Sequence, residues 1–322
     1  MNGIPQRQIY SPSRRHRGRG LLFSLILLGS ALAQTPPASP VAQYPSPMAE
    51  HIRSHERLSP DEAPPVTFTV RGALPRDVPV YRVHGSPGDS ADLVVHFHGA
   101  GWLVGIAAKR NGRSLAVAAV NLGGGSSAYE RPFTPPAVFP ALLAALRDSL
   151  TAHGPAVAGV RRLYLSAFSA GYGAVRAILR THPEMVDGIL LLDGLHTDYI
   201  PDRTVLAEGG ALNADKLSGF LDFARWAIAG EKRMVITHSS IFPGTYASTT
   251  ETTDWLIAEL GLKRTPVTAW GPVGMQQVGA TVSGRLSILA FAGNSAPDHV
   301  DHLHGLPVFL DSLLTRSEDG AP

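Results

Sequence analysis

The sequence predicts an α/β fold in which a mainly parallel, twisted sheet is covered by helices on both faces. Two observations support this prediction. Short and nearly continuous apolar runs recur along residues 66–316, as expected for strands that are buried on both faces. Between them lie stretches with apolar residues at helical spacing, so strands and helices alternate. In such a sheet, binding and catalysis collect where the parallel strands end.

The strands and helices follow in order from these patterns. Apolar and β-branched runs predict strands at 66–70, 78–83, 92–98, 114–121, 162–168, 188–193, 233–238 and 286–292. Helical spacing of apolar residues predicts helices at 138–150, 170–180, 217–229, 253–260 and 308–314. Because helices separate many of the consecutive strands, these strands are expected to run parallel.

The composition suits a globular chain and excludes several kinds of function. The chain has 322 residues, 44% of them hydrophobic and 17% charged, which is enough for a large core. It has no cysteine, which excludes disulfides, thiolate metal sites and a cysteine nucleophile. Five of the 28 basic residues precede residue 34, so the rest of the chain carries 23 basic against 26 acidic residues. We therefore expect no nucleic-acid partner.

The N-terminal region predicts export from the cytoplasm. Residues 1–33 have the pattern of a signal peptide: a basic stretch, an apolar run at 21–30 and an A-L-A cleavage sequence ending at Ala33. The run is shorter than the about 20 residues of a membrane span, although an uncleaved anchor is an alternative. Residues 34–65 are proline-rich and predict a linker, and 66–322 predict the folded domain. We expect a secreted or periplasmic protein without a stable membrane span after processing.

Ser169 is the candidate nucleophile, because it lies between a predicted strand and a predicted helix. Ala167 precedes it by two residues and Gly171 follows it by two. A sharp strand–turn–helix projects a hydroxyl only when the flanking side chains are small, and the helix N-terminus stabilises negative charge beside it. A serine at this position is also a common helix N-cap. The apolar strand before it and the glycine-containing helix after it favour the nucleophile.

A second strand end carries the sequence H-F-H-G-A-G-W, from His96 to Trp102. Together with the Ser169 turn, this sequence resembles the α/β-hydrolase superfamily. The resemblance implies an α/β-hydrolase fold and an oxyanion hole made of backbone amides. Its donors would come from Gly99, Ala100, Gly101 and Ala170. Each such amide accelerates acyl transfer by about 10²- to 10³-fold when it faces the developing oxyanion.

The third strand end supplies candidate general bases. The segment 290–307, between the last predicted strand and the last predicted helix, contains three histidines: His299, His302 and His304. The superfamily places its catalytic histidine after the last strand, where it takes the proton of the serine hydroxyl. His304 is disfavoured because it lies closest to the helix start. The sequence leaves His299 and His302 both open.

Asp193 is the candidate acid that orients this histidine. Many members of the superfamily take the acid from a later strand, but here that strand ends at His238 without an acidic residue. Some members take it from the strand after the nucleophile, where Asp193 lies, and the order Ser, acid, His is then kept. The alternative for Asp193 is a capping role in the turn. Asp198 and Asp254 are the reserve acids, and His238 is a candidate for the wall of the site.

These residues predict a secreted serine hydrolase, resembling carboxylesterases, that cleaves an ester or amide bond through an acyl-enzyme. Ser169 attacks the carbonyl, His299 or His302 takes its proton, and Asp193 orients the imidazole. The expected partner is a small-molecule or polymer ester or amide, and no metal or cofactor is expected. A binding or scaffold protein with the same fold and no activity is the main alternative.

Two other chemistries fit the sequence less well. A metal-dependent hydrolase would use the His and Asp residues at 298–304 with His96 and His98, but it leaves the Ser169 turn without a role. A dinucleotide cofactor needs G-x-G-x-x-G and an acid at the end of the next strand. The glycines after His98 are one residue too widely spaced, and the next strand ends in Asn121.

Overall fold

The computed structural model describes residues 57–85, 89–153 and 159–315. The predicted signal peptide, and the predicted linker up to residue 56, lie outside the described residues. Contacts divide the chain into the units 1–44 and 45–322, and every element described below belongs to the second unit. None of the helices in the described part of the chain is long and apolar enough to cross a bilayer.

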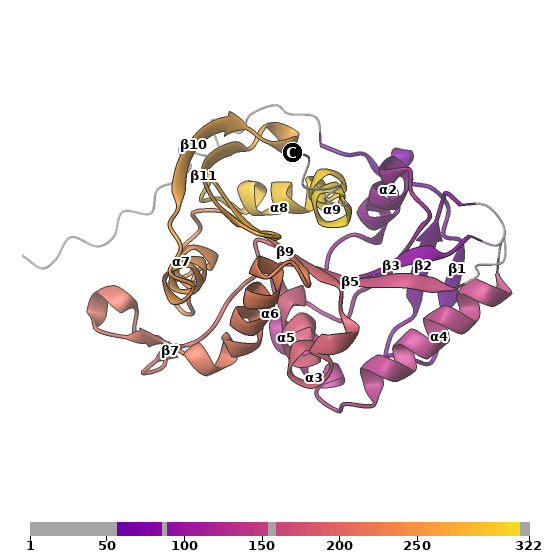
Figure 1. Cartoon of the computed structure of the whole chain (residues 1–322), viewed down its shortest axis with the longest axis horizontal. Helices are drawn as coiled ribbons and strands as arrows, with labels where there is room; N and C mark the ends of the chain where they lie inside the picture. Colours follow the sequence, from indigo (N-terminus) through magenta and orange to yellow (C-terminus); the bar gives the residue numbers. More distant parts are fainter. Residues whose placement is uncertain (1–56, 86–88, 154–158, 316–322) are drawn as a thin grey trace, which may run out of the picture. The chain divides into compact units, whose positions relative to one another are not determined.

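A ten-stranded sheet forms the centre of the fold (Figure 1). Its strands are β1 (Phe68–Val70), β2 (Val78–Arg82), β3 (Ala91–Phe97), β4 (Leu115–Val120), β5 (Val160–Phe168), β6 (Gly188–Leu192), β9 (Arg233–His238), β10 (Thr265–Trp270), β11 (Gln276–Ser283) and β12 (Leu286–Phe291). Their order is β1-β2-β4-β3-β5-β6-β9-β12-β11-β10, parallel from β4 to β12 and antiparallel at both edges. This mainly parallel sheet with helices on both faces is the α/β architecture that the sequence predicts.

Helices cover both faces of this sheet (Figure 1). The helices are α2 (Gly101–Asn111), α3 (Ser126–Phe133), α4 (Val138–Ala152), α5 (Tyr172–Thr181), α6 (Ser218–Ile228), α7 (Thr249–Glu259), α8 (Ala296–His304) and α9 (Leu306–Leu314). Helices α2, α8 and α9 pack on one face, and α3 to α7 pack on the other. A short ribbon of β7 (Tyr199–Ile200) and β8 (Ala211–Leu212) follows β6.

Two apolar layers, one on each face, explain the continuous apolar runs of the central strands. In β3, Leu93 and Val95 pack under α3 to α7, whereas Val94 packs under α2 and α9. In β6, Ile189 packs under α3 to α7, and Leu190 packs under α2 and α9. Successive side chains of a strand point to opposite faces, so a strand that is covered twice needs apolar residues at every position.

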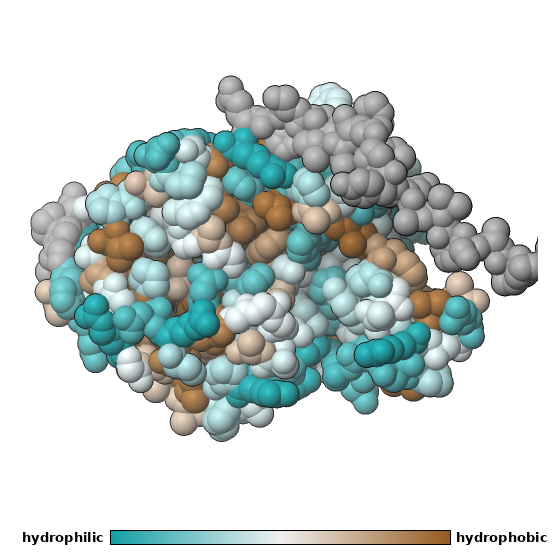
Figure 2. Space-filling view, turned by 180° about the vertical axis from the view of Figure 1, so that it is seen from behind, coloured by the Kyte–Doolittle hydropathy of each residue, from teal (hydrophilic) through white to brown (hydrophobic). Residues whose placement is uncertain are grey.

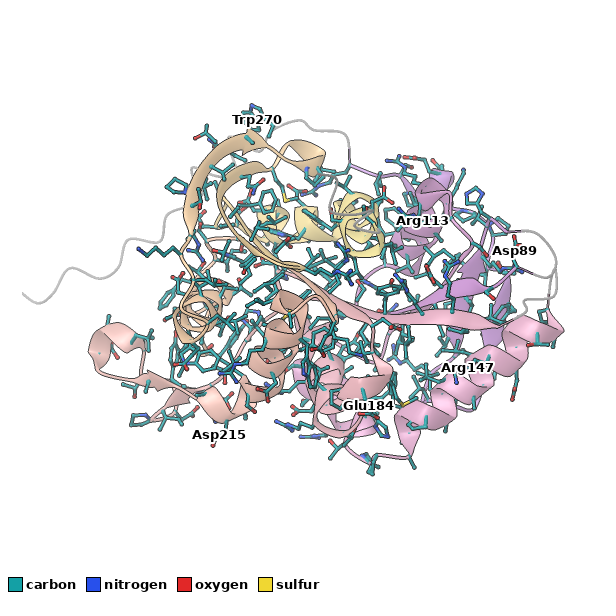
Figure 3. The ribbon with its side chains drawn as sticks, in the orientation of Figure 1. Asp89, Arg113, Arg147, Glu184, Asp215 and Trp270 are labelled. Carbon is teal, nitrogen blue, oxygen red and sulfur yellow. The ribbon has the colours of Figure 1, made fainter. Side chains whose placement is uncertain are left out.

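The surface of the domain is mostly hydrophilic. Charged side chains such as Asp89, Arg147, Glu184 and Asp215 are exposed outside the helical layers (Figure 3). Figure 2 shows that apolar side chains on the rear face are scattered among hydrophilic ones. Scattered apolar residues of this kind are normal for a folded domain and indicate no function by themselves.

The segment predicted to connect the last strand to the last helix contains a further helix, α8. Ser295 caps this helix by accepting a hydrogen bond from the Asp298 amide, while the Asp298 side chain accepts from the Ser295 amide. Pro297 lies in the first turn, where its missing N–H costs nothing. The histidines that follow the last strand therefore lie on a helix rather than in a loop.

Residues 57–65, which belong to the predicted linker, lie against the domain. Arg57 donates to Asp301 of α8 at 2.8 Å, and the Leu58 amide donates to Nδ1 of His304 at 3.1 Å. The Leu58 side chain is buried. This stretch therefore anchors to the helix that also carries His299.

Candidate active site

Ser169 lies at a sharp turn between β5 and α5. Its φ is 45°, in the left-handed region that residues other than glycine rarely adopt. Two glycines allow the close packing around it. A Cβ on Gly171 would lie 2.2 Å from the Phe97 carbonyl oxygen, and one on Gly194 would lie 2.5 Å from the Ser169 carbonyl oxygen. Ala167 is buried within β5. Because glycine has no Cβ, neighbouring backbones can approach this strained turn closely, and strain of this kind concentrates at functional sites.

Asp193 follows β6 in a similar turn, with φ at 43°. Its side chain is buried and its carboxylate accepts four hydrogen bonds. Oδ1 accepts from the Ser239 amide at 2.9 Å and from Thr249 Oγ1 at 2.7 Å. Oδ2 accepts from Ser239 Oγ at 2.7 Å and from His299 Nδ1 at 2.7 Å. An acceptor with so many donors is built to carry a negative charge.

The electrostatics agree with an ionised Asp193. Burial alone raises the pKa of this carboxyl, but the charge interaction with His302 and the hydrogen bond from His299 outweigh burial, so the pKa lies well below its usual range. The carboxylate is therefore charged throughout the neutral range. It can orient an imidazole and stabilise the imidazolium form.

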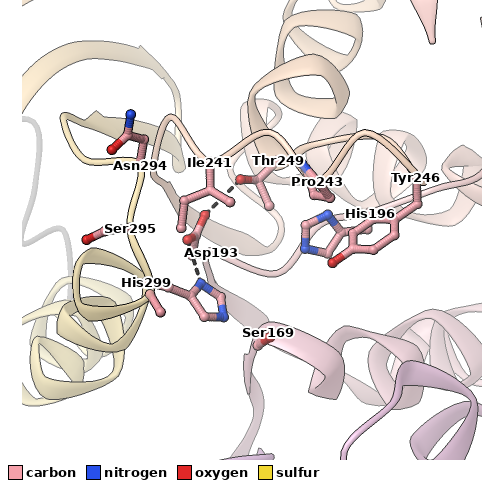
Figure 4. Close-up of a pocket in the computed structure, with 11 residues that line it drawn as sticks. Ser169, Asp193, His196, Ile241, Pro243, Tyr246, Thr249, Asn294, Ser295 and His299 are labelled. Carbon is pink, nitrogen blue, oxygen red and sulfur yellow. Dashed lines mark hydrogen bonds and ion pairs between the residues drawn. The ribbon is translucent and has the colours of Figure 1, made fainter. Parts of the chain in front are cut away.

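The two histidines that the sequence left open are placed differently by α8. His299 donates from Nδ1 to Asp193, its ring lies against Phe168 at a centroid distance of 4.6 Å, and Figure 4 shows its other nitrogen turned toward Ser169. The side chain is 25% exposed. His302 is buried, and its Nδ1 forms a hydrogen bond with Thr237 Oγ1 at 2.7 Å. Only His299 is therefore brought together with Asp193 and Ser169.

Ser169 opens onto two cavities. The first, of about 260 Å³, also contains Asp193 and His299 in its wall (Figure 4). Its other lining residues are His196, Ile241, Pro243, Tyr246, Thr249, Asn294, Ser295 and Ala296. The second, of about 310 Å³, is lined by Gly124, Gly125, Ser126, Ser169, Ala170, Tyr172, His196, Thr197, Asp198 and Tyr246. The residues common to both walls are Ser169, His196 and Tyr246.

Only one of the residues predicted for the oxyanion hole lines a cavity beside Ser169. Ala170 lines the second cavity, in the first turn of the helix that begins at Ser169, where backbone amides have no acceptor within the helix. Gly99, Ala100 and Gly101 line neither of the two cavities. The loop they form packs instead near α8, since a Cβ on Gly99 would lie 2.7 Å from Leu303. The oxyanion hole stays a prediction.

Other histidines near the site are held by structural contacts. His96 is buried, with Nδ1 2.9 Å from Ser166 Oγ and Nε2 donating to the His98 carbonyl at 2.8 Å; burial lowers its pKa to about 4. His98 pairs through Nδ1 with the Tyr129 hydroxyl at 2.8 Å. His238 is buried and lines neither cavity, and burial lowers its pKa to about 4.

The reserve acids and the metal hypothesis find little support in this geometry. Asp198 pairs with Lys216, and Asp254 pairs with Arg264 at 2.8 Å. Neither residue contacts His299 or His302 through a hydrogen bond. Across residues 57–85, 89–153 and 159–315, no three His, Asp or Glu side chains are placed to hold a metal ion.

Sequence reasoning missed the residues that donate to Asp193, and it missed His196 and Tyr246, which line both cavities. Ser239 follows β9, where the sequence has no acidic residue, and it donates twice to Asp193. Thr249 begins α7 after the capping box formed by Ser248 and Glu251. This S-x-x-E pattern was a readable helix start. No local pattern indicates that His196 and Tyr246 reach Ser169.

Comparison with known proteins finds similarity only among solved structures. No family model and no curated protein matches the chain. A thermostable esterase matches with a TM-score of 0.40 and 16% identity, covering 76% of this chain and only 59% of its own. An esterase from the Planctomycetes species Thermogutta terrifontis matches at 0.44, with 16% identity over 82% and 98% of the two chains. A feruloyl esterase module from Clostridium thermocellum matches at 0.47, with 10% identity over 83% and 97%. These similarities do not establish an activity for this chain, which has to be argued from the site.

Proposed function

We propose that the protein is a serine hydrolase that cleaves ester bonds through an acyl-enzyme. Ser169 is the nucleophile, His299 the general base and acid, and Asp193 the residue that orients the imidazole. The observation that supports this most is the 2.7 Å hydrogen bond from His299 to Asp193 beside a cavity that Ser169 also lines (Figure 4). The other nitrogen of His299 is then available to the serine hydroxyl.

The reaction follows from the hydrogen-bond inventory of the three residues. A carboxylate only accepts hydrogen bonds, so Nδ1 of His299 carries a hydrogen and Nε2 carries the lone pair. Nε2 takes the Ser169 proton as Oγ attacks the carbonyl carbon, and returns it to the leaving alkoxide when the tetrahedral intermediate collapses. A water molecule then attacks the carbonyl carbon of the acyl-enzyme while Nε2 takes its proton. Nε2 next gives this proton to Oγ of Ser169 as the acid is released.

Asp193 contributes by staying ionised during this cycle. Its four donors satisfy the carboxylate on both oxygens, so it stabilises the imidazolium of His299 without taking its proton. The amide of Ala170 and one from the loop Gly99–Gly101 are the proposed donors to the oxyanion. No step of this cycle requires a metal or a cofactor.

The test is covalent labelling with a fluorophosphonate probe, followed by hydrolysis of p-nitrophenyl esters of increasing chain length. Wild-type protein is expected to be labelled at Ser169 and to hydrolyse short esters, whereas Ser169→Ala loses both the label and at least about 10³-fold in kcat. A chelator should change neither result. Folded wild-type protein that takes no label would favour the non-catalytic scaffold. Activity that a chelator abolishes would favour a metal-dependent hydrolase.

The proposed site of action is outside the cytoplasm. This proposal comes from the basic and apolar pattern of residues 1–33. Expression of the full chain in a bacterial host, followed by N-terminal sequencing of the periplasmic fraction, is expected to give a chain that starts at Gln34. Full-length protein confined to the cytoplasm would contradict it.

A further inference from the structure

His196 lies at the junction of the two cavities, three residues after Asp193. It lines both walls together with Ser169 and Tyr246. Figure 4 shows His196 and His299 on either side of the space above Ser169. The catalytic cycle proposed above uses His299 and gives His196 no task. A second imidazole beside the nucleophile therefore needs its own explanation.

The His196 ring is fixed in one orientation. Nδ1 lies 2.9 Å from the Ala247 carbonyl, which only accepts, so Nδ1 carries the hydrogen. Tyr172 and Tyr246 stand edge to face against the ring, at centroid distances of 5.4 and 5.0 Å. Among the described residues, none forms a hydrogen bond with Nε2. This nitrogen therefore presents a lone pair next to the cavities.

The ring is also neutral at neutral pH. Burial lowers the pKa of His196 and outweighs the opposing effects of the Ala247 carbonyl and of Asp193. In the neutral ring with a hydrogen on Nδ1, Nε2 acts only as an acceptor. Its natural partner in a bound molecule is a hydroxyl or N–H group.

The two cavities differ in the chemistry of their walls. The first contains apolar side chains, among them Ile241, Pro243 and Ala296. The second contains hydroxyl groups and a carboxylate, from Ser126, Tyr172, Thr197 and Asp198. An ester that spans both would place an apolar part in the first cavity and a polar part in the second, with His196 at the boundary.

We propose that Nε2 of His196 accepts a hydrogen bond from a substrate hydroxyl close to the ester bond, which makes hydroxylated esters the preferred substrates. The inference rests on the proposed function, since it concerns the same site. A bound ester displaces water from the junction, so an ester without the hydroxyl leaves Nε2 with no partner. Sites that are built to bind a substrate hydroxyl reject the analogue that lacks it. The hydroxyl belongs to either the acyl or the alcohol part, and the assay distinguishes these two positions.

The experiment compares kcat/KM for matched esters. Phenyl lactate and phenyl propionate differ by a hydroxyl on the acyl group, and glyceryl monobutyrate and propyl butyrate differ by hydroxyls on the alcohol. Wild-type protein is expected to prefer the hydroxylated member of at least one pair by about 10- to 100-fold. The pair that shows the preference identifies the part that carries the hydroxyl.

Two variants separate recognition of a hydroxyl from a structural role of the ring. In His196→Asn the amide nitrogen can replace Nδ1 and donate to Ala247, but nothing replaces Nε2. In His196→Gln the side-chain oxygen reaches toward the Nε2 position, while the donor to Ala247 is lost. We expect the Asn variant to lose the hydroxyl preference, because its kcat/KM falls more on the hydroxylated ester than on the plain ester, and the Gln variant to keep part of the preference. If the ring only holds the Ala247 carbonyl in place, the Asn variant should keep more of the hydroxyl preference than the Gln variant.

Two results would overturn the inference: a wild-type protein without preference in either pair, or an Asn variant that keeps the whole preference. Fluorophosphonate labelling of Ser169 is measured in every variant. Unlabelled wild-type protein means that the proposed function fails. Labelled and active protein with no hydroxyl preference means that only the assignment of His196 fails.

Discussion

The cavity wall and the buried layer beneath it both contain imidazoles, but the two regions use them differently. In the wall, His299 and His196 each fix Nδ1 on an oxygen acceptor and have a second ring nitrogen for which no described residue is a partner. In the buried layer, His96 and His238 have protein partners at both nitrogens, and His302 is buried against Thr237. An imidazole becomes available for chemistry when one nitrogen is fixed and the other meets a cavity. Residue type and distance along the chain do not decide this.

The strongest test of this comparison replaces His299 and His302 of α8 separately. His299→Gln is expected to lower kcat on a p-nitrophenyl ester by at least about 10³-fold, because the proposed base is lost. His302→Gln should keep kcat within about tenfold and lower the midpoint of thermal unfolding, because a buried polar contact is disturbed. Steady-state kinetics and thermal unfolding measure both effects. Equal losses of kcat at unchanged thermal stability would remove the distinction between the two residues.

The next test concerns the strand ends on which the wall depends. Gly194→Ala places a methyl group 2.5 Å from the Ser169 carbonyl oxygen and 2.7 Å from its amide nitrogen. Ser169, the proposed nucleophile, has to move, and a displacement of this kind should cost about 10²-fold in kcat. Gly159→Ala is the matched control, because an added Cβ there meets no atom within 4 Å. Gly194→Ala with wild-type kcat would show that Ser169 tolerates displacement.

The strand ends could be predicted from the sequence, whereas much of the rest of the site could not. Ser169 and Asp193 follow apolar runs directly, and the close approach of backbones at these turns requires small residues that a reader can see in A-F-S-A-G and D-G. The fold class followed from the same alternation of runs and was confirmed. Helix α8 was not predicted, although Ser295 and Asp298 form a capping box.

The choice between His299 and His302 shows why the remainder was out of reach. The two residues lie about one turn apart on α8, and both follow the last strand closely, so sequence position alone does not separate them. Their roles depend on which side of the helix meets Asp193, and that rotation is set by packing against residues such as Phe168 and Phe291 from other strands. Ser239 and Thr249 likewise reach Asp193 only through the tertiary fold.

A smaller effect is expected from the donors to Asp193. Thr249→Val keeps the shape of the side chain and removes the 2.7 Å hydrogen bond to Oδ1. The carboxylate remains ionised but orients His299 less firmly, so kcat should fall by about 3- to 10-fold and stability by about 1–3 kcal/mol. Thr253→Val is the control on the same helix, because its hydroxyl donates to helix carbonyls and accepts from Arg264 at 3.4 Å, without a hydrogen bond to Asp193. If both variants lower kcat equally, the effect belongs to α7 as a whole.

The smallest effect concerns the stability of the buried layer and its dependence on pH. The pKa of His96 and of His238 is lowered by burial to about 4, against 6.5 for the unperturbed side chain. Below pH 6.5 the unfolded chain binds protons that the folded chain does not, so the free energy of unfolding falls as the pH falls, until it levels off below the folded pKa. At pH 6 each histidine should lower it by about 1 kcal/mol relative to pH 8.

Urea unfolding at pH 8 and pH 6 measures this difference, and a second variant assigns it. His96→Gln removes one of the two titrating rings, so the drop in unfolding free energy between the two pH values should shrink by about 1 kcal/mol even if the variant is less stable at both. The pH difference, and not the absolute stability, is therefore the informative quantity. If the variant keeps the full difference, His96 is protonated in the folded protein to the same degree as in the unfolded chain. Its ring would then not belong to the neutral buried layer that contrasts with the cavity wall.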